Sequence, residues 1–294
     1  MERIHKILSD NWALRRQEYE NLAALLLSSM ANGNLEGITA LLGTGYPEAR
    51  LLQPQAQTPA ITKTWNVLFD DDIPVGSILL VPLTGMLYSW ETSMLVELIK
   101  KADANPNISG LLLKIDGPGG MSSHVERLAR AIREFSKPSA TVVTNLMASA
   151  HFWIGTATDR IFVASPLCEV GSVGAFLTYV SFLEYYRKNG IDYREIYPDT
   201  ADLKNKASRA VAESGDESLF KERLEKLHKA FASDVELQVG IPYDPALPLY
   251  RGETFSGAEA LEMGIAQAEG DVEDALEWIS LQISIAEANS FFAR

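Results

Sequence analysis

The stretch ISGLLLKIDGPGG, residues 108–120, decides the fold class of this chain. It opens with an almost continuous apolar run, which is typical of a strand buried on both faces of a parallel sheet. The run then enters a turn that ends in Gly119 and Gly120. Two successive glycines let the backbone turn sharply and leave outward-pointing N–H groups. Such donors suit a developing oxyanion, and they equally fit a tight strand-to-helix turn that has no further role.

Strand and helix patterns alternate on both sides of this stretch. Apolar runs between turns predict strands, and apolar positions at helical spacing predict helices. Such alternation is typical of an α/β fold with a mainly parallel sheet and right-handed crossovers. After Gly174 the pattern is mainly helical, and Ser256 is expected to cap a helix. The predicted strands are 76–85, 108–115, 139–145, 161–164 and 191–196, and the predicted helices are 93–104, 124–135, 149–157, 179–189, 217–239 and 256–261.

The first 60 residues differ in pattern from the rest of the chain. Residues 2–31 carry apolar positions at helical spacing, whereas 43–62 is rich in Gly, Pro, Gln and Thr, like a linker. We expect a helical N-terminal appendage with its linker over 1–60 and one α/β domain over 61–294. No signal-peptide core is evident, and 22–31 is too short for a bilayer span of about 20 residues. A cytoplasmic protein without a membrane anchor is therefore expected.

Composition narrows the classes of function. The net charge is −13, and lysine and arginine are interspersed with acidic residues, which argues against nucleic acid as a partner. Cys168 is the single cysteine, so neither an intrachain disulfide nor a cysteine-based metal site can form. The four histidines show no metal-ligand spacing. We expect neither a metal nor a cofactor.

A candidate nucleophile follows the third predicted strand, in NLMASAHFW at 145–153. Ser149 lies between two alanines and opens a predicted helix, where the helix dipole and free N–H groups favour negative charge. The same residues also fit a serine that only caps or packs the helix. A nucleophilic serine needs a base, and His151 faces another side of the helix. A desolvated lysine is the alternative, and periodicity cannot separate Lys204 and Lys206 from ordinary surface lysines.

Five motifs, taken in order, resemble the signal peptide peptidase A family of Ser/Lys peptidases. The likeness is greatest to the phage and prophage branch, whose members act in capsid maturation. The resemblance implies a Clp/crotonase-like α/β fold with a repeated β-β-α core. It covers roughly residues 77–279, whereas residues 1–60 have no assigned counterpart. The motifs are GSILLVPLTG at 76–85, LKIDGPGG at 113–120, ASAHFWIG with TDRI within 148–161, EVGSVG at 169–174 and RGETFSGAEALEMGI at 251–265.

The resemblance also implies roles for individual residues. Many members of the family have a pair of glycines after the nucleophile, where this chain has Ala150 and His151, and the usual context of the lysine is missing. The region of the lysine is the least well matched part, so the departures concern the identity of the base more than that of the nucleophile. The implied roles are Ser149 as nucleophile, Lys204 as general base with Lys206 as the fallback, Gly119 and Gly120 at the oxyanion hole, and Ser172 as the serine that orients the lysine.

The function that the resemblance implies is hydrolysis of peptide bonds through an acyl-enzyme. The expected protein is a homo-oligomeric maturation protease of prophage type that cleaves capsid or scaffold protein in the bacterial host. A soluble, signal-peptide-peptidase-like housekeeping protease is the alternative. Two other classes share the fold: crotonase enzymes, for whose coenzyme A we find no basic phosphate site, and a non-catalytic assembly protein. Peptide substrates are expected to bind extended, by adding a strand to an exposed edge near the site.

Overall fold

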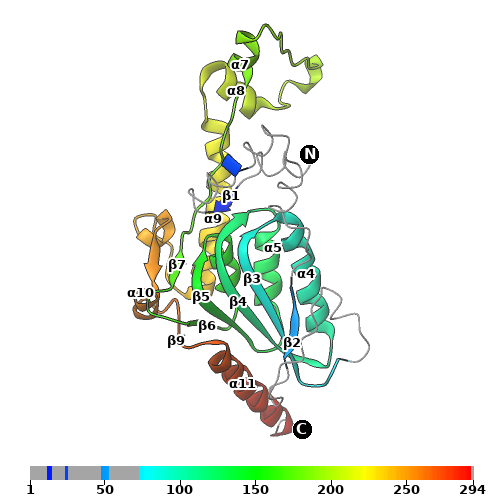
Figure 1. The fold of residues 1–294 in the computed structure, drawn as a ribbon, viewed down its shortest axis with the longest axis vertical. Helices are drawn as coiled ribbons and strands as arrows, with labels where there is room; N and C mark the ends of the chain where they lie inside the picture. Colours follow the sequence, from blue (N-terminus) through cyan, green and yellow to red (C-terminus); the bar gives the residue numbers. More distant parts are fainter. Residues whose placement is uncertain (1–11, 15–23, 26–47, 53–72, 293–294) are drawn as a thin grey trace.

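The fold is built on a mainly parallel sheet, which lies at the centre of the molecule (Figure 1). The computed structural model describes residues 12–14, 24–25, 48–52 and 73–292 of the 294-residue chain. Four central strands run parallel and are ordered as in the sequence. They are β3 (Ser77–Leu87), β4 (Ile108–Met121), β5 (Ser139–Ala148) and β6 (Arg160–Val163). The short strands β2 (Arg50–Leu52) and β9 (Ala268–Glu269) extend the sheet beyond β3 and β6.

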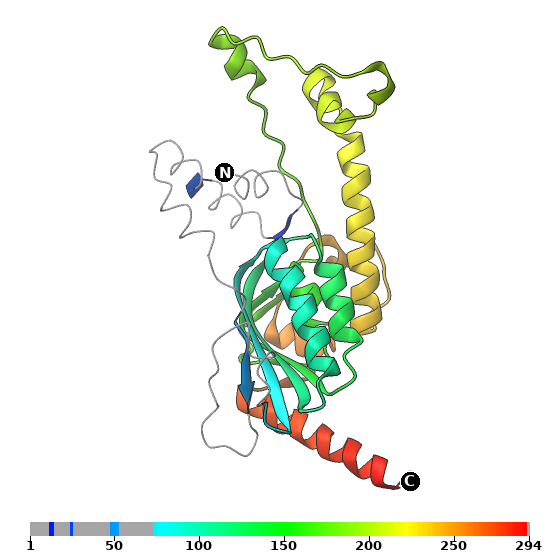
Figure 2. The ribbon, with the colours of Figure 1, turned by 90° about the vertical axis from the view of Figure 1, so that its right-hand side faces the viewer.

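Both faces of the central strands are buried, because successive side chains of a strand point to opposite faces. Leu111 and Leu113 belong to the larger hydrophobic core, on the face that the first helices cover. Leu112, between them, clusters instead with Ala275 and Ile279 on the opposite face. The C-terminal part of the last helix extends away from the sheet (Figure 2). The helices of the first face are α4 (Ser89–Ala104), α5 (Val125–Arg133) and α6 (Ala150–Gly155), and the last helix is α11 (Val272–Phe292).

Most elements predicted from the sequence are confirmed, including the four strands at the centre and the helices between them. Ser256 caps α10 (Gly257–Glu262), and its side chain forms a capping box with Glu259. The strand predicted at 191–196 is wrong. This segment is almost entirely exposed and lies in no strand, because an apolar pattern cannot form a strand unless a neighbouring backbone pairs with it.

An arm projects from the sheet between β7 (Glu169–Gly171) and the middle of α9 (Ser218–Val239) (Figures 1 and 2). An extended segment leads outward to α7 (Leu183–Lys188) and α8 (Lys206–Ser214), and α9 then returns to the body. Ala207 is the one buried residue between positions 174 and 230. The arm therefore has almost no core of its own and is held in place by its root.

The N-terminal residues that the structure describes differ from the prediction for 1–60. The helix expected over 2–31 is wrong at β1 (Trp12–Leu14), a strand that pairs with β4. The linker expected over 43–62 is wrong at β2, whose Leu51 and Leu52 are buried against the sheet. In both places a strand edge offers backbone hydrogen bonds that outweigh the local pattern. The rest of the expected appendage lies outside the described residues, and the division at residue 60 stays a prediction.

Candidate active site

Ser149 lies at the turn where β5 ends and α6 begins. Its φ of 55° and ψ of −116° place it in a region that non-glycine residues rarely adopt. Such a conformation costs roughly 1–3 kcal/mol and occurs where the surrounding structure imposes it, often at catalytic turns. Ser149 is 1% exposed. The geometry matches that of a nucleophile held on a sharp strand-to-helix turn.

The motif at 169–174 borders this turn directly. The Ser149 N–H donates a hydrogen bond to the Gly171 carbonyl oxygen at 2.8 Å, and the Ser149 Oγ lies 3.5 Å from the Gly174 carbonyl oxygen. Ser172 lies between these two glycines with a φ of 61°, and its N–H donates to the Glu253 carbonyl oxygen at 2.7 Å. The structure thus brings the segment of Ser172 to the predicted nucleophile.

The glycine pair near the end of β4 lies on the other side of the site, and the turn predicted to end there is wrong, because Gly119 and Gly120 pair with Met86 and Leu87 of β3 as part of the strand. A Cβ added at Gly120 would lie 2.0 Å from the Leu87 carbonyl oxygen, so only glycine lets β3 approach this closely. The Gly119 N–H donates to Nδ1 of His151 at 3.0 Å. One of the two amides expected to face an oxyanion is therefore already bonded to a side chain of the same molecule.

His151 is the polar residue whose position the sequence did not reveal. The helical-face argument disfavoured it as the base for Ser149, but it did not show that the ring, which extends from α6, is fully buried against β4. Because Nδ1 accepts the Gly119 N–H, we assign the proton of the neutral ring to Nε2, for which the described residues provide no hydrogen-bond partner. A Cβ at Gly117 would lie 2.4 Å from His151 Cε1. A residue larger than glycine at position 117 would collide with the His151 ring, so Gly117 is the feature of the sequence that indicates a bulky side chain next to it.

Because the pKa of His151 is low, we expect the folded protein to lose stability as the pH falls. Burial lowers this pKa to about 3 from the ordinary value of 6.5. Between these values the unfolded chain binds a proton that the native chain does not, so the free energy of unfolding falls as the pH falls. The slope is about 1.4 kcal/mol per pH unit below pH 6.5. We expect His151→Gln, which does not titrate and retains an acceptor for Gly119, to remove this slope in urea unfolding at pH 7, 6 and 5.

His124 supplies the matched control for this experiment. It is exposed and precedes α5, so His124→Gln tests whether loss of any histidine changes the slope. An acid-side slope that His151→Gln leaves intact would show that His151 is not the group that carries it.

The two lysines lie far from this centre. Lys204 is in the turn that precedes α8, and Lys206 is the first residue of α8. Both are exposed. In Figure 1, α8 is at the outer end of the arm, whereas β5, which Ser149 directly follows in the chain, lies in the body from which the arm projects. The structure therefore brings Ser149, Gly119, Gly120 and the 171–174 segment together in one chain, but it does not bring either lysine to them.

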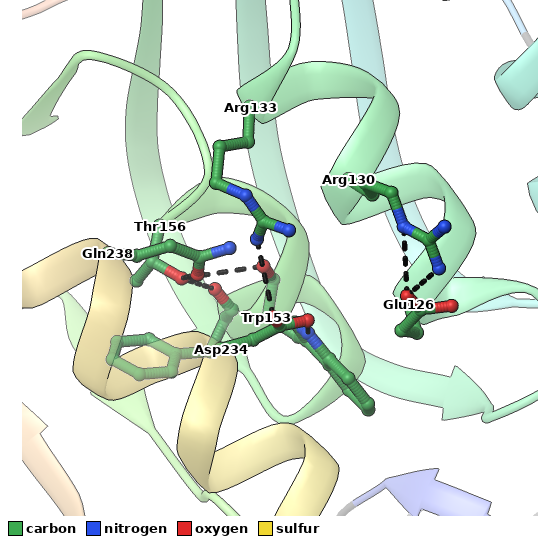
Figure 3. A network of polar contacts seen from close by, with 8 residues as sticks. Glu126, Arg130, Arg133, Trp153, Thr156, Asp234 and Gln238 are labelled. Atoms are coloured by element: carbon green, nitrogen blue, oxygen red, sulfur yellow. Dashed lines mark hydrogen bonds and ion pairs between the residues drawn. The ribbon is translucent and has the colours of Figure 1, made fainter.

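The root of the arm is anchored to the helix that begins at Ser149 (Figure 3). On α6, Trp153 donates its indole Nε1–H to Asp234 of α9 at 2.7 Å, and its ring stacks on Phe231 with the centroids 4.5 Å apart. Arg133 of α5 forms an ion pair with the same Asp234 at 3.3 Å. Asp234 thus joins α5, α6 and α9, so the position of the arm is coupled to that of the candidate nucleophile.

Removal of the Asp234 carboxylate should be costly. Asp234→Ala leaves a buried indole N–H without its acceptor, and we expect the free energy of unfolding to fall by about 1–3 kcal/mol. The control is Glu126→Ala, which breaks the partly exposed ion pair with Arg130 also drawn in Figure 3 and should cost about 0–1 kcal/mol. Chemical denaturation measures both. Equal losses in the two variants would contradict an anchoring role for Asp234.

The sequence of this chain matches the family model "Peptidase family S49" over residues 131–285, which is more than half of the chain. The chain belongs to Peptidase family S49. The matched segment of this S49 chain includes Ser149, the 169–174 motif and the whole arm, but begins after the glycine pair of β4. The prediction of a relative of signal peptide peptidases is thereby confirmed at the level of the family.

Several curated proteins are similar to this S49 chain. The head-tail preconnector protein GP5 of Enterobacteria phage P21 is 24% identical over 69% of this chain and 42% of its own length. The capsid assembly protease C of Escherichia phage lambda is 22% identical over 70% of this chain and 51% of its own length. The chloroplastic serine protease SPPA of Arabidopsis thaliana is 23% identical over 62% of this chain and 27% of its own length. The chain thus spans about half the length of these relatives, or less.

Two solved structures resemble part of this chain. A ClpP1 mutant from Listeria monocytogenes superposes with a TM-score of 0.44 at 12% identity, covering 67% of this chain and 94% of its own. An enoyl-CoA hydratase/isomerase family member superposes with a TM-score of 0.38 at 19% identity, covering 74% of both chains. The α/β class expected from the sequence agrees with the mainly parallel sheet and the helices that cover it in this chain. Within the described residues, no helix is both long and apolar enough to cross a bilayer.

Proposed function

We propose that this S49 chain is a serine endopeptidase in which Ser149 is the nucleophile and Lys204 is the general base. The observation that carries the proposal is the strained turn at Ser149. It lies between the glycine pair of β4 and the 171–174 segment, and its positive φ is a strained conformation for a serine. Membership of family S49 supports the same chemistry.

The base is proposed to come from a second copy of the chain. Lys204 is exposed at the outer end of the arm, whereas a lysine serves as a base only where burial favours its neutral form. Soluble monomers rarely expose large apolar patches, so we infer that a neighbouring subunit covers the arm and buries the lysine. A monomer in light scattering at micromolar concentration would contradict this arrangement. The large apolar residues of the arm that are more than half exposed are Val180, Phe182, Tyr185, Ile191, Tyr193, Ile196 and Leu203.

The proposed reaction proceeds through an acyl-enzyme. Ser149 Oγ attacks the peptide carbonyl carbon as its proton passes to the neutral Lys204, and the lysine then protonates the leaving amine. Water, deprotonated by the same lysine, hydrolyses the ester and restores the serine. Ser172 is proposed to orient the lysine, with Lys206 as the fallback base.

Backbone amides are proposed to stabilise the tetrahedral oxyanion. The N–H of Ala150, the first residue of α6, has no partner within its helix and lies next to the nucleophile in sequence. The Gly119 N–H joins it once the oxyanion displaces His151 as its acceptor, and Gly120 keeps this part of β4 close to β3. Loss of one such donor typically costs roughly 3 kcal/mol of transition-state stabilisation.

The substrate is proposed to be a capsid or scaffold protein, cleaved by a maturation protease of prophage type in the cytoplasm of the bacterial host. The names of two relatives, the head-tail preconnector protein and the capsid assembly protease, support this choice. The likeness to the serine protease SPPA keeps a housekeeping, signal-peptide-peptidase-like protease as the alternative.

Digestion of an unfolded protein mixture tests the proposed activity. We expect wild-type protein to generate new peptide termini, identified by mass spectrometry, that are absent with Ser149→Ala. Adding purified phage capsid and scaffold proteins in one reaction, and a set of signal peptides in another, distinguishes the two substrate classes. If no peptide of any class is cleaved, the chain is a non-catalytic member of its family and the proposal fails.

A further inference from the structure

We propose that the chain's own residues 12–14 occupy the edge of β4 at which a substrate peptide binds, so that the N-terminal segment acts as a built-in competitor. The inference rests on the proposed function for the identity of the ligand, an extended peptide. Its physical basis is the pairing of β1 with β4, in which Trp12, Ala13 and Leu14 lie antiparallel to Met121, Gly120 and Gly119.

The topology fixes which edge of β4 is occupied. At Gly119 and Gly120, β4 is already paired in parallel with Met86 and Leu87 of β3. A strand has only two edges for backbone hydrogen bonds, so β1 must take the edge opposite β3. That edge faces β5, with which β4 pairs as far as Gly117 and Met147.

The edge taken by β1 becomes free because of the turn at the nucleophile. The last residue of β5, Ala148, pairs with Gly171 of β7, and the chain then turns at Ser149 into α6. β5 is therefore not paired with β4 at 119–121. A peptide that enters this gap can pair with backbone groups beside Ser149, which is the mode of binding by strand addition. β1 already fills the gap, and a substrate cannot pair there until β1 leaves.

Because β1 occupies the edge of β4, it should weaken the binding of an external peptide there by a predictable factor. A tethered segment has an effective concentration in the millimolar range. If the tethered segment itself binds the free edge with a Kd near 0.1 mM, an effective concentration of about 1 mM leaves only about a tenth of the edges free, so an external peptide binds about tenfold more weakly to the intact chain. The competition depends on backbone donors, which proline lacks.

The test uses full-length protein that carries Ser149→Ala, so that bound peptide is not cut. The triple variant Trp12→Pro, Ala13→Pro and Leu14→Pro removes every N–H of β1. Ala24→Pro, at an exposed position of the same N-terminal part, is the control for proline in this region. Fluorescence anisotropy measures the affinity of a labelled peptide of sequence LSDNWALRRQE, residues 8–18.

The expected result is about tenfold tighter binding to the triple variant than to the parent, with Ala24→Pro equal to the parent. Equal affinity for the triple variant and the parent, absence of binding to both, or an equal gain in Ala24→Pro would overturn the inference. Because binding is read without hydrolysis, an inactive wild-type enzyme would refute the proposed function and leave this result interpretable. With an active enzyme, the triple proline variant without Ser149→Ala should also cleave peptides with a several-fold lower KM.

Discussion

Ser149→Ala should lower kcat/KM for peptide hydrolysis at least about 1,000-fold, because the attacking oxygen is removed while the backbone donors remain. The loss should appear in kcat, since the serine contributes little to binding of the intact peptide. The assay is cleavage of a fluorogenic peptide whose sequence is taken from the first substrate identified by mass spectrometry.

Ser233→Ala is the control for this comparison, because Ser233 is exposed on α9 and lies outside the proposed site. It should retain wild-type rates. Ser149→Ala with activity like that of Ser233→Ala would mean that another group is the nucleophile.

Lys204→Ala should be nearly as inactive as Ser149→Ala, because the two residues act as one unit, whereas Lys206→Ala should retain most activity. If the dyad forms between copies, two inactive variants can rescue each other. After mixing equal amounts of Ser149→Ala and Lys204→Ala and allowing subunits to exchange, about a quarter of the sites would pair an intact serine with an intact lysine by random assembly. Activity should therefore return to about a quarter of the wild-type value.

Each alternative for the base has its own signature in this experiment. A mixture that stays inactive after verified subunit exchange would indicate a dyad within one chain and contradict the role of the neighbouring arm. Loss of activity in Lys206→Ala, with Lys204→Ala active, would transfer the role of base to the fallback residue.

The centre of the fold could be predicted from the sequence because its strands are buried on both faces. The apolar run at 108–115 fits a central parallel strand, and the structure confirms it as part of β4. The convergence of Ser149 with the 171–174 segment follows from the same topology, since parallel strands end at the same edge of a sheet. The central strands and the position of Ser149 beside the 171–174 segment depend on the local apolar pattern and on the order of the strands, and both can be read from the sequence.

Other features depend on contacts that no local pattern encodes. Residues 2–31 have helical spacing, but residues 12–14 form a strand because β5 leaves an edge of β4 unpaired. The arm projects from the body and separates Lys204 from Ser149, and its root on α9 is held by contacts of Asp234 with residues far away in the sequence. The bond between His151 and Gly119 joins positions 32 residues apart. Each depends on tertiary structure, which periodicity does not report.

The measurement that tests the central claim most directly is covalent labelling with a serine-reactive fluorophosphonate, followed by mapping of the adduct by mass spectrometry. We expect a single adduct on Ser149 in the native protein, no adduct after denaturation, and much slower labelling of Lys204→Ala. Absence of an adduct on Ser149, while a known serine protease is labelled in the same tube, would contradict the assignment of Ser149 as an activated nucleophile.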